Sequence, residues 1–227
     1  MKKQTTNSQN RPTRGSDVYI LETSQIDVAT NAEGKKLNNR LDFGDLEIFA
    51  DEIYAYGKIE NALIGYRKDG RFKLTEGERR LKASKIIEEK YGVVWPIPFR
   101  CESKDVTNID RYFKQIAMNN SGKKFSPVED AATIDSLLKE GATEEQICTR
   151  LTMSAVYLCN LKKLHSAPDL IKDLINNNVM SATLAMSIFR KHKDFDEAIE
   201  VIQAGIVHAQ NTKGTNKITA TDIVASQ

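Results

Sequence analysis

The stretch Gly77-Glu78-Arg79-Arg80-Leu81-Lys82-Ala83 joins a β-rich run at 71–75 to a predicted helix at 78–90, and it decides how the first half of the chain folds. A glycine between a strand and a helix lets an anion approach backbone N–H groups that have no partner within the helix. The helix dipole disfavours the two arginines of the first turn unless an anion or a carboxylate lies beside them. The stretch therefore predicts an anion site, and arginines in a solvated turn are the competing interpretation.

Around this stretch the pattern is that of a small mixed α/β unit. A helix is predicted from Leu46, because apolar residues recur there every three or four positions, and Gly57 can end it. The β-rich runs 62–67 and 71–75 are divided by Lys68-Asp69-Gly70, where Asp-Gly supplies the positive φ of a tight hairpin. Further strands are predicted at 18–21 and 98–101, and a further helix at 108–119.

From Ser126 onward the pattern is helical until the last ten residues. Ser126-Pro127-Val128-Glu129 combines a capping serine with proline at the first helical position, so a helix should begin there and end at Gly141. A capping box at 143–146 opens a helix at 144–151, and after a brief turn Ser154 caps another helix that runs to about 164. Such a pair is typical of a helix-turn-helix, and a generic helical bundle is the competing interpretation. Further helices are predicted at 168–176, 181–192 and 195–209, and a strand and turn at 217–224.

The second helix of a helix-turn-helix enters the major groove of DNA, so its less buried residues are the predicted contacts. Tyr157 and Asn160 are candidates for base edges, whereas Lys162 and Lys163 are placed to meet phosphates. The competing interpretation is that Asn160 only solvates a packed helix. The predicted DNA-binding residues are Ser154, Ala155, Tyr157, Asn160, Lys162 and Lys163.

The composition is that of an ordinary soluble protein. The 227 residues allow one or two domains, 40% are hydrophobic, and 33 basic residues nearly balance 31 acidic ones. No apolar run is long enough for a membrane span or a secretory signal, so we expect a cytoplasmic protein with no membrane partner. Cys101, Cys148 and Cys159 are too few and too scattered for a disulfide framework or a zinc site. Residues 1–17 are predicted to be a disordered basic arm, either a solubilising tail or a segment that touches a phosphate backbone.

Four motifs follow one another along the chain. Arg40-Leu41-Asp42-Phe43 precedes the first long helix, Gly57-Lys58-Ile59-Glu60-Asn61 follows it, and then come the 77–83 stretch and Ser126-Pro127-Val128-Glu129-Asp130-Ala131. In this order they resemble the ParB family of DNA partition proteins over about residues 36–190. The resemblance implies an α+β chain. After the arm at 1–17 it would have a ParB/sulfiredoxin-like nucleotide-binding domain at 18–122, an all-α helix-turn-helix domain at 123–210 and a C-terminal tail at 211–227.

The resemblance also implies a ligand. ParB proteins bind CTP and use it to switch between loading at a centromere-like DNA site and closing as a sliding clamp. The cofactor-binding residues that the resemblance implies are Gly57, Glu60, Gly77, Glu78, Arg79, Arg80, Asn119 and Lys123.

Two departures from the family pattern bear on the chemistry. Glu60-Asn61 stands where the family usually has Gln-Pro, and the added carboxylate would repel phosphates unless a metal or an arginine intervenes. Where the family has Glu-Asn-x-x-Arg, this chain has Met118, Asn119 and Gly122, so Asn119 is the one implied metal ligand that remains. A thioether is a poor ligand for Mg²⁺, so CTP binding is expected with at most weak CTPase activity. Lys123 can meet a phosphate in place of the missing arginine.

Three functions are compatible with these patterns. The first is a sequence-specific partition protein of a plasmid, phage or chromosome, whose partners would be double-stranded DNA, a ParA-type ATPase and a second copy of the chain. The second is a transcription regulator on the same scaffold with a vestigial nucleotide site. The third is a nuclease or nucleotidase, although the chain lacks the clustered carboxylates of a two-metal site. Only 34 residues follow Lys193, where the family usually has a C-terminal dimerisation domain, so either the sequence is truncated or a dimer forms otherwise. Ile199, Ile202 and Ile206 could form such a contact, and core packing is the competing interpretation.

Overall fold

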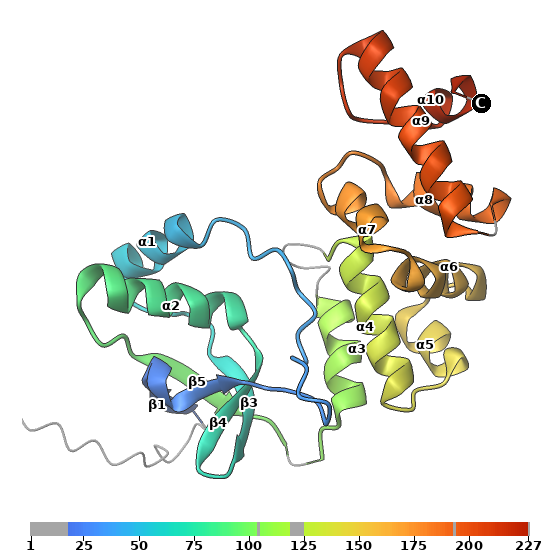
Figure 1. Cartoon of the computed structure of the whole chain (residues 1–227). Coiled ribbons are helices and arrows are strands. Elements are labelled where there is room, and N and C mark those ends of the chain that lie inside the picture. Colours follow the sequence, from blue (N-terminus) through green and yellow to red (C-terminus); the bar gives the residue numbers. More distant parts are fainter. Residues whose placement is uncertain (1–17, 104, 119–124, 193, 227) are drawn as a thin grey trace, which may run out of the picture. The chain divides into compact units, whose positions relative to one another are not determined.

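The computed structural model describes residues 18–103, 105–118, 125–192 and 194–226. The chain divides into two compact units, residues 1–115 and 116–227, and each is described by itself (Figure 1). Among the described residues, no helix has both the length and the apolar character needed to cross a bilayer. The predictions made for Asn119, Gly122 and Lys123 lie outside the described residues.

A five-stranded sheet in the order β1-β5-β3-β4-β2 forms the first unit. Its strands are β1 (Val18–Leu21), β2 (Ile26–Val28), β3 (Leu63–Lys68), β4 (Arg71–Glu76) and β5 (Ile97–Cys101). The β1–β5 and β3–β4 pairs are antiparallel, while β3–β5 and β2–β4 are parallel. The predicted hairpin is confirmed, because Asp69 (φ 51°) and Gly70 (φ 77°) both have the positive φ that a two-residue turn requires. Strand β2 was not expected from the sequence, since its three residues are fixed only by their pairing with β4.

Two helices pack side by side on one face of this sheet, α1 (Leu46–Tyr56) and α2 (Glu78–Tyr91) (Figure 1). Their buried residues meet the inward side chains of the strands in one apolar cluster, among them Ile53 and Leu81 from the helices and Leu63 and Phe99 from the sheet. Gly57 ends α1 with φ 82°, and its N–H donates to the carbonyls of Ile53 and Tyr54, as the sequence predicted. The core thus places the end of α1 and the start of α2 on the same side of the sheet.

Helix α3 (Asn108–Met118) leads out of the first unit and is tied to it by charged side chains. Arg111 donates through Nε to Oε2 of Glu102 at 2.8 Å, and these side chains are only 11% and 6% exposed. Lys114 forms a second ion pair with Glu76, the last residue of β4. Glu76 ends β4 directly before Gly77, and Glu102 directly follows β5. The two ion pairs therefore hold α3 near the start of α2.

All regular elements described in the second unit are helices. They are α4 (Pro127–Lys139), α5 (Glu144–Leu151), α6 (Ala155–Ser166), α7 (Asp169–Asn176), α8 (Ala182–Lys191), α9 (Phe195–Lys213) and α10 (Ala220–Ala225). The predicted caps are confirmed: Ser126, Thr143 and Ser154 each accept a hydrogen bond from the N–H three residues further on. With the sheet and helices of the first unit, these helices confirm a mixed α/β chain.

The predicted strand and turn at 217–224 is wrong. Ile218 is buried and its N–H donates to the carbonyl of Val179 at 2.8 Å, and α10 then packs on α9. The carboxylate of Asp222 is fully buried, where it accepts hydrogen bonds from Thr219 and from Lys213. These contacts with distant residues, which the local sequence does not record, place a helix where a strand was expected. The same packing buries Ile202 of α9, which favours core packing over dimer contact for that residue.

Candidate functional site

Gly77 adopts a backbone conformation that only glycine takes without strain. Its φ is 101°, and a Cβ there would lie 3.0 Å from Cγ of Leu63 and 3.1 Å from Nη2 of Arg80. No side chain caps the helix that follows, and the first N–H with an intrahelical acceptor is that of Leu81, which donates to the Gly77 carbonyl. The N–H groups of the first turn of α2 therefore remain available to an anion, as the sequence predicted for this type of turn.

Arg80 connects α2 to the loop that follows α1. Its Nη1 donates to the carbonyl oxygens of Asn61 and Ala62, the latter at 3.0 Å. Burial lowers the pKa of this guanidinium, and the nearby Glu76 acts in the opposite direction, so the group stays charged at any pH of interest. Arg80 is thus a structural tie in this structure as well as a candidate ligand.

A hollow of about 340 Å³ lies beside Arg80. It is lined by Phe49, Glu52, Ile53, Tyr56, Lys58, Ile59, Glu60, Asn61 and Arg80. The structure thus brings together Glu60 and Arg80, which are 20 positions apart in the sequence, while Gly57 ends α1 just before the lining residues. Tyr56 donates its hydroxyl proton to Oε1 of Glu60 at 2.6 Å, which partly offsets the negative charge that this departure from the family pattern introduces.

The other two predicted residues of this stretch lie differently. The guanidinium of Arg79 stacks 4.1 Å from the ring centroid of Phe49, which itself lines the hollow. Glu78 turns toward segment 36–38 instead, where its carboxylate accepts from Asn38 at 2.9 Å and lies 3.3 Å from Nζ of Lys36. Its side chain is 4% exposed, so it holds that segment against α2. Phe49, Tyr56 and Lys36 were missed because nothing in the sequence links them to the 77–83 stretch.

A second candidate surface lies on α6, which is joined to α5 by residues 152–154. Thr152 ends α5 in the left-handed conformation, and Ser154 caps α6 through the N–H of Tyr157 at 3.1 Å. Val156 is 68% and Tyr157 38% exposed, and Ala155 is exposed beside them. Leu158, Leu161 and Leu164 form the buried side of the helix. The first turn of α6 therefore presents an exposed face, as expected from the sequence.

The two lysines near the end of α6 have different environments. Nζ of Lys162 lies 2.5 Å from Oε1 of Glu144 on α5, and both side chains are substantially exposed. Lys163 is half-buried, donates to the carbonyl of Phe189 on α8 and lies 5.6 Å from the centroid of its ring. Asn160, which precedes these lysines in sequence and follows the first turn of α6, is half-buried. Lys162 thus belongs to the exposed face, whereas Lys163 connects α6 to α8.

A hollow of about 750 Å³ adjoins the start of α6, and its lining includes Asp130, Arg150, Met153 and Tyr157. Burial raises the pKa of Asp130 to about 6, and the neighbouring Glu129 adds to the effect. Burial, with Asp130 as a further cause, also raises the pKa of Tyr157. A carboxyl group with a raised pKa therefore lines the same hollow as Tyr157, one of the predicted DNA contacts. Among the described residues, no group of three His, Cys, Asp or Glu side chains could hold a metal ion.

The fold and these surfaces define a two-unit protein with an uncapped, glycine-started helix in one unit and an exposed helix face in the other. No family model matches the chain. It is 26% identical over 165 residues to a probable chromosome-partitioning protein ParB of Rickettsia felis, covering 71% of this chain and 53% of that protein. It is 28% identical over 125 residues to the chromosome-partitioning protein Spo0J of Thermus thermophilus, covering 54% of this chain and 43% of that one. The chain spans about half the length of the curated relatives it matches.

A solved structure shares the fold. The C-terminally truncated ParB from Caulobacter crescentus, complexed to the centromeric parS site, aligns with a TM-score of 0.50 and 16% identity over 82% of this chain and 92% of that one. The resemblance predicted from the four motifs is therefore confirmed. The chain is similar in sequence to the ParB and Spo0J chromosome-partitioning proteins and shares the fold of the solved ParB structure.

Loss of the Arg80 side chain should destabilise the first unit. Arg80→Ala removes the donors to the carbonyls of Asn61 and Ala62, and hydrogen bonds from a charged donor contribute about 1.5 to 3 kcal/mol each. We expect the free energy of unfolding in urea to fall by at least about 1.5 kcal/mol. Lys85→Ala, at an exposed position of the same helix, is the control and should change it by less than about 0.5 kcal/mol. Equal changes in the free energy of unfolding for the two substitutions would show that the Arg80 hydrogen bonds contribute nothing to stability.

The raised pKa of Asp130 makes stability depend on pH. An unfolded aspartate titrates near pH 3.9, so between about pH 4 and 6 the folded chain binds more protons and loses stability as pH rises. Because Asp130 is partly exposed, we expect Asp130→Asn to stabilise the chain by only about 1 to 2 kcal/mol at pH 8, and hardly at pH 4, in urea unfolding. Asp169→Asn, at a side chain 93% exposed, should show no such trend. A gain for Asp130→Asn that is the same at both pH values would contradict the assignment.

Proposed function

We propose that this chain is a ParB-like, sequence-specific DNA-binding protein of plasmid, phage or chromosome partition, with a CTP-type nucleotide site that switches its DNA-bound state. The observation that carries the proposal is the combination of an uncapped, glycine-started helix in the first unit with the short helix pair α5–α6 in the second. Its curated relatives, named chromosome-partitioning proteins, support the same function. Because the chain spans about half of those relatives, this function is inferred for the part they share.

Each unit has a separate role in this proposal. Residues 18–122 form the ParB/sulfiredoxin-like nucleotide-binding domain and 123–210 the helix-turn-helix domain, preceded by the basic arm at 1–17 and followed by the segment 211–227. The mixed sheet with α1 and α2 supports the first assignment, and the tight turn between α5 and α6 supports the second. A centromere-like duplex, a ParA-type ATPase and a second copy of the chain are the proposed partners, and the association would be with DNA in the cell interior.

The nucleotide would place its phosphates on the first turn of α2. The free N–H groups there and the guanidiniums of Arg79 and Arg80 supply donors, and the 340 Å³ hollow offers the aromatic ring of Phe49 to a flat base. Glu78 acts indirectly, by holding segment 36–38 in place. Gly57 would contribute by ending α1 at the hollow, and Glu60 by its place in the lining.

The chain's residues do not fit a magnesium site. Asn119 is the only implied ligand, and no cluster of acids and histidines occurs in the part of the chain that the structure describes. We therefore propose that CTP binding, supported by Lys123 as a point charge, matters more than turnover. The alternative of a transcription regulator with a vestigial nucleotide site is favoured by one observation: the carbonyls of Asn61 and Ala62 already occupy donors of Arg80.

In the DNA-binding unit, α6 would enter the major groove. Tyr157 at its exposed first turn and Asn160 are the proposed base contacts, with Ser154 and Ala155 closest to the helix start. Lys162 can leave its exposed ion pair with Glu144 to meet a phosphate, because such pairs contribute little. Lys163 would have to give up its contacts with Phe189, so we propose that it supports the orientation of α6.

A DNA-binding measurement tests the role of α6. We expect Asn160→Ala to reduce preference for a cognate duplex by about 1 to 3 kcal/mol while leaving scrambled DNA nearly unaffected, because asparagine can pair bidentately with adenine. Lys162→Ala should weaken both duplexes alike and lower the salt slope by about one unit. Lys163→Ala is the matched comparison and should reduce stability in urea more than Lys162→Ala does. Equal losses on both duplexes for Asn160→Ala would remove α6 from the recognition role.

A nucleotide titration tests the first unit and separates the two candidate functions. Wild-type protein should bind CTP in preference to ATP, GTP and UTP, in the presence or absence of cognate DNA. Arg79→Ala should weaken CTP binding at least about tenfold without changing stability, since the side chain stacks on Phe49 and its buried Nε has no hydrogen-bond partner among the described residues. Arg80→Ala should lose both binding and stability. Absence of nucleotide binding in a folded wild-type protein, combined with specific DNA binding, would favour the regulator.

A further inference from the structure

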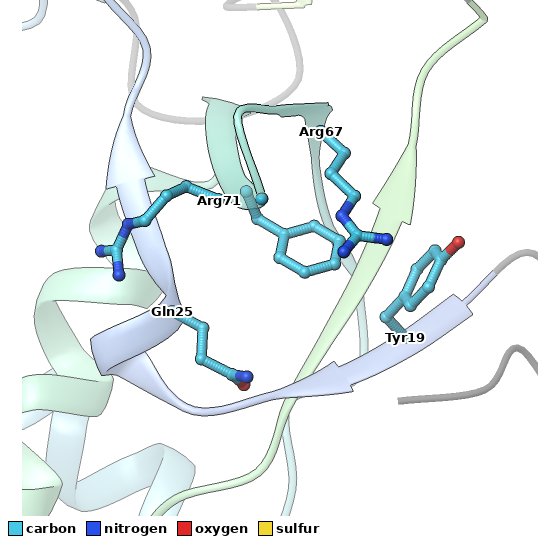
Figure 2. A pocket seen from close by; sticks show the side chains of 6 residues that line it. Tyr19, Gln25, Arg67 and Arg71 are labelled. Atoms are coloured by element: carbon cyan, nitrogen blue, oxygen red, sulfur yellow. The ribbon is translucent and has the colours of Figure 1, made fainter. Parts of the chain in front are cut away.

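The first unit has a second pocket, at the opposite end of β4 from Gly77. It is lined by Tyr19, Gln25, Arg67, Gly70, Arg71 and Phe72, and we call it the hairpin pocket (Figure 2). These residues come from β1, the short 3₁₀ helix at Thr23–Gln25, and the β3–β4 hairpin. Since β4 runs from Arg71 to Glu76, the hairpin pocket and the first turn of α2 are separated by the length of the strand.

The polar groups of the hairpin pocket are hydrogen-bond donors. The side-chain oxygen of Gln25 accepts from the N–H of Glu22 at 2.9 Å, which leaves its NH₂ group to act as the donor. Arg67 and Arg71 carry donors only, and the Tyr19 hydroxyl can also donate. No acidic residue is among those that line the pocket in the described part of the chain. Such a lining favours an acceptor-rich, negatively charged ligand.

The carboxylate that pairs with Arg71 lies outside this lining. Asp27 on β2 receives Nε and Nη2 of Arg71 at 2.8 and 2.6 Å and Nζ of Lys73 at 2.9 Å. The hydrogen bonds from Arg71, and then from Lys73, hold the pKa of Asp27 well below its usual range, so it stays ionised and paired. In Figure 2, Arg71 extends away from Arg67, whose guanidinium lies on the side of Tyr19. Of the two arginines that line the pocket, Arg67 is the one without a carboxylate partner among the described residues.

Arg67 is oriented by aromatic rings rather than by an acid. Its guanidinium carbon lies 5.8 Å from the ring centroid of Phe72, and the rings of Phe72 and Tyr19 are 5.2 Å apart. Among the residues that the structure describes, no carboxylate pairs with Arg67. The side chain thus lines the pocket together with Gln25, and its donors have no hydrogen-bond acceptor among the described residues.

From these contacts we propose that the hairpin pocket binds a phosphate-type oxyanion, held by the guanidinium of Arg67 and the NH₂ group of Gln25, with the Tyr19 and Phe72 rings as its wall. Its volume of about 230 Å³ is below that of pockets for drug-sized ligands, which suits one phosphate group and a small substituent. The phosphate can come from a small phosphate ester or from the backbone of DNA.

The decisive variant is Gln25→Glu. Glutamate keeps the oxygen that accepts from Glu22 N–H, and both Glu and Gln serve at this position of a capping box, so the local fold is retained. The substitution replaces the donor that faces the pocket with a negative charge. Lys68→Ala is the matched control, because it removes a neighbouring exposed cation that does not line the pocket.

Residue-resolved NMR on the full chain reports directly on phosphate binding at the hairpin pocket. Titration with inorganic phosphate should shift the amide of Gly70 and the side-chain NH₂ of Gln25 in the wild type, while the amide of Gly77 reports independently on the proposed nucleotide site. Gln25→Glu should weaken the effect at Gly70 at least about tenfold, and Lys68→Ala less than about twofold. A Gly70 amide that does not respond in the wild type, or that responds equally in both variants, overturns the proposal.

Two further titrations identify the source of the phosphate. Uridine monophosphate that shifts Gly70 assigns the pocket to small phosphate esters, whereas a response to duplex DNA alone assigns it to the nucleic-acid backbone. No response at Gly70 to either probe overturns the proposal even if Gly77 responds. A failure at Gly77 with a response at Gly70 would count against the proposed nucleotide site and leave the hairpin pocket standing.

Discussion

The positive φ of Gly77 is the constraint on which the first unit depends. The chain leaves β4 and begins α2 within one residue, and the space where a side chain would lie is taken by Leu63 and by the guanidinium of Arg80. Arg80 can therefore reach across to the carbonyls of Asn61 and Ala62. That contact fixes the loop after α1, and the loop in turn forms one side of the hollow beside α2. A single backbone conformation thus determines both the helix start and the shape of the candidate site.

The start of α2 differs chemically from the starts of α4, α5 and α6 in the second unit. In the second unit, α4, α5 and α6 each start at a serine or threonine whose hydroxyl accepts one of the first N–H groups. These helix starts are satisfied from within the chain. Helix α2 starts at a glycine that has no side chain to offer, and its first turn carries two arginines. The first turn of α2 is therefore left without a side-chain cap, whereas α6 has a capped start and presents exposed side chains beyond it.

Charged residues that are neighbours in sequence serve different purposes after folding. Lys162 and Lys163 are adjacent, but one lies in an exposed ion pair and the other is tied to the carbonyl end of α8. Glu78 and Arg79 diverge in the same way, one toward segment 36–38 and the other onto Phe49. Successive helical positions point about 100° apart, so one residue decides whether a charge meets solvent or protein. Arg67 and Arg71 at the hairpin repeat this division, since only Arg71 has a carboxylate partner.

The sequence by itself determined the features that depend on a few neighbouring residues. The Asp69-Gly70 hairpin, the end of α1 at Gly57 and the caps at Ser126, Thr143 and Ser154 follow from local backbone and side-chain preferences. The order of four such local motifs was also enough to recognise the ParB resemblance.

Only the tertiary structure decided the features that depend on distant partners. Strand β2 exists through its pairing with β4, and α10 replaces the expected strand because Ile218, Asp222 and Ile223 pack against residues of α9 and the loop before α8. The meeting of Glu60 with Arg80, and the assignment of Lys163 to α8, likewise require chain segments far apart in sequence to come together. The physical reason is that burial and ion pairing depend on partners from distant segments of the chain. A local sequence pattern shows only which residues are able to make such contacts.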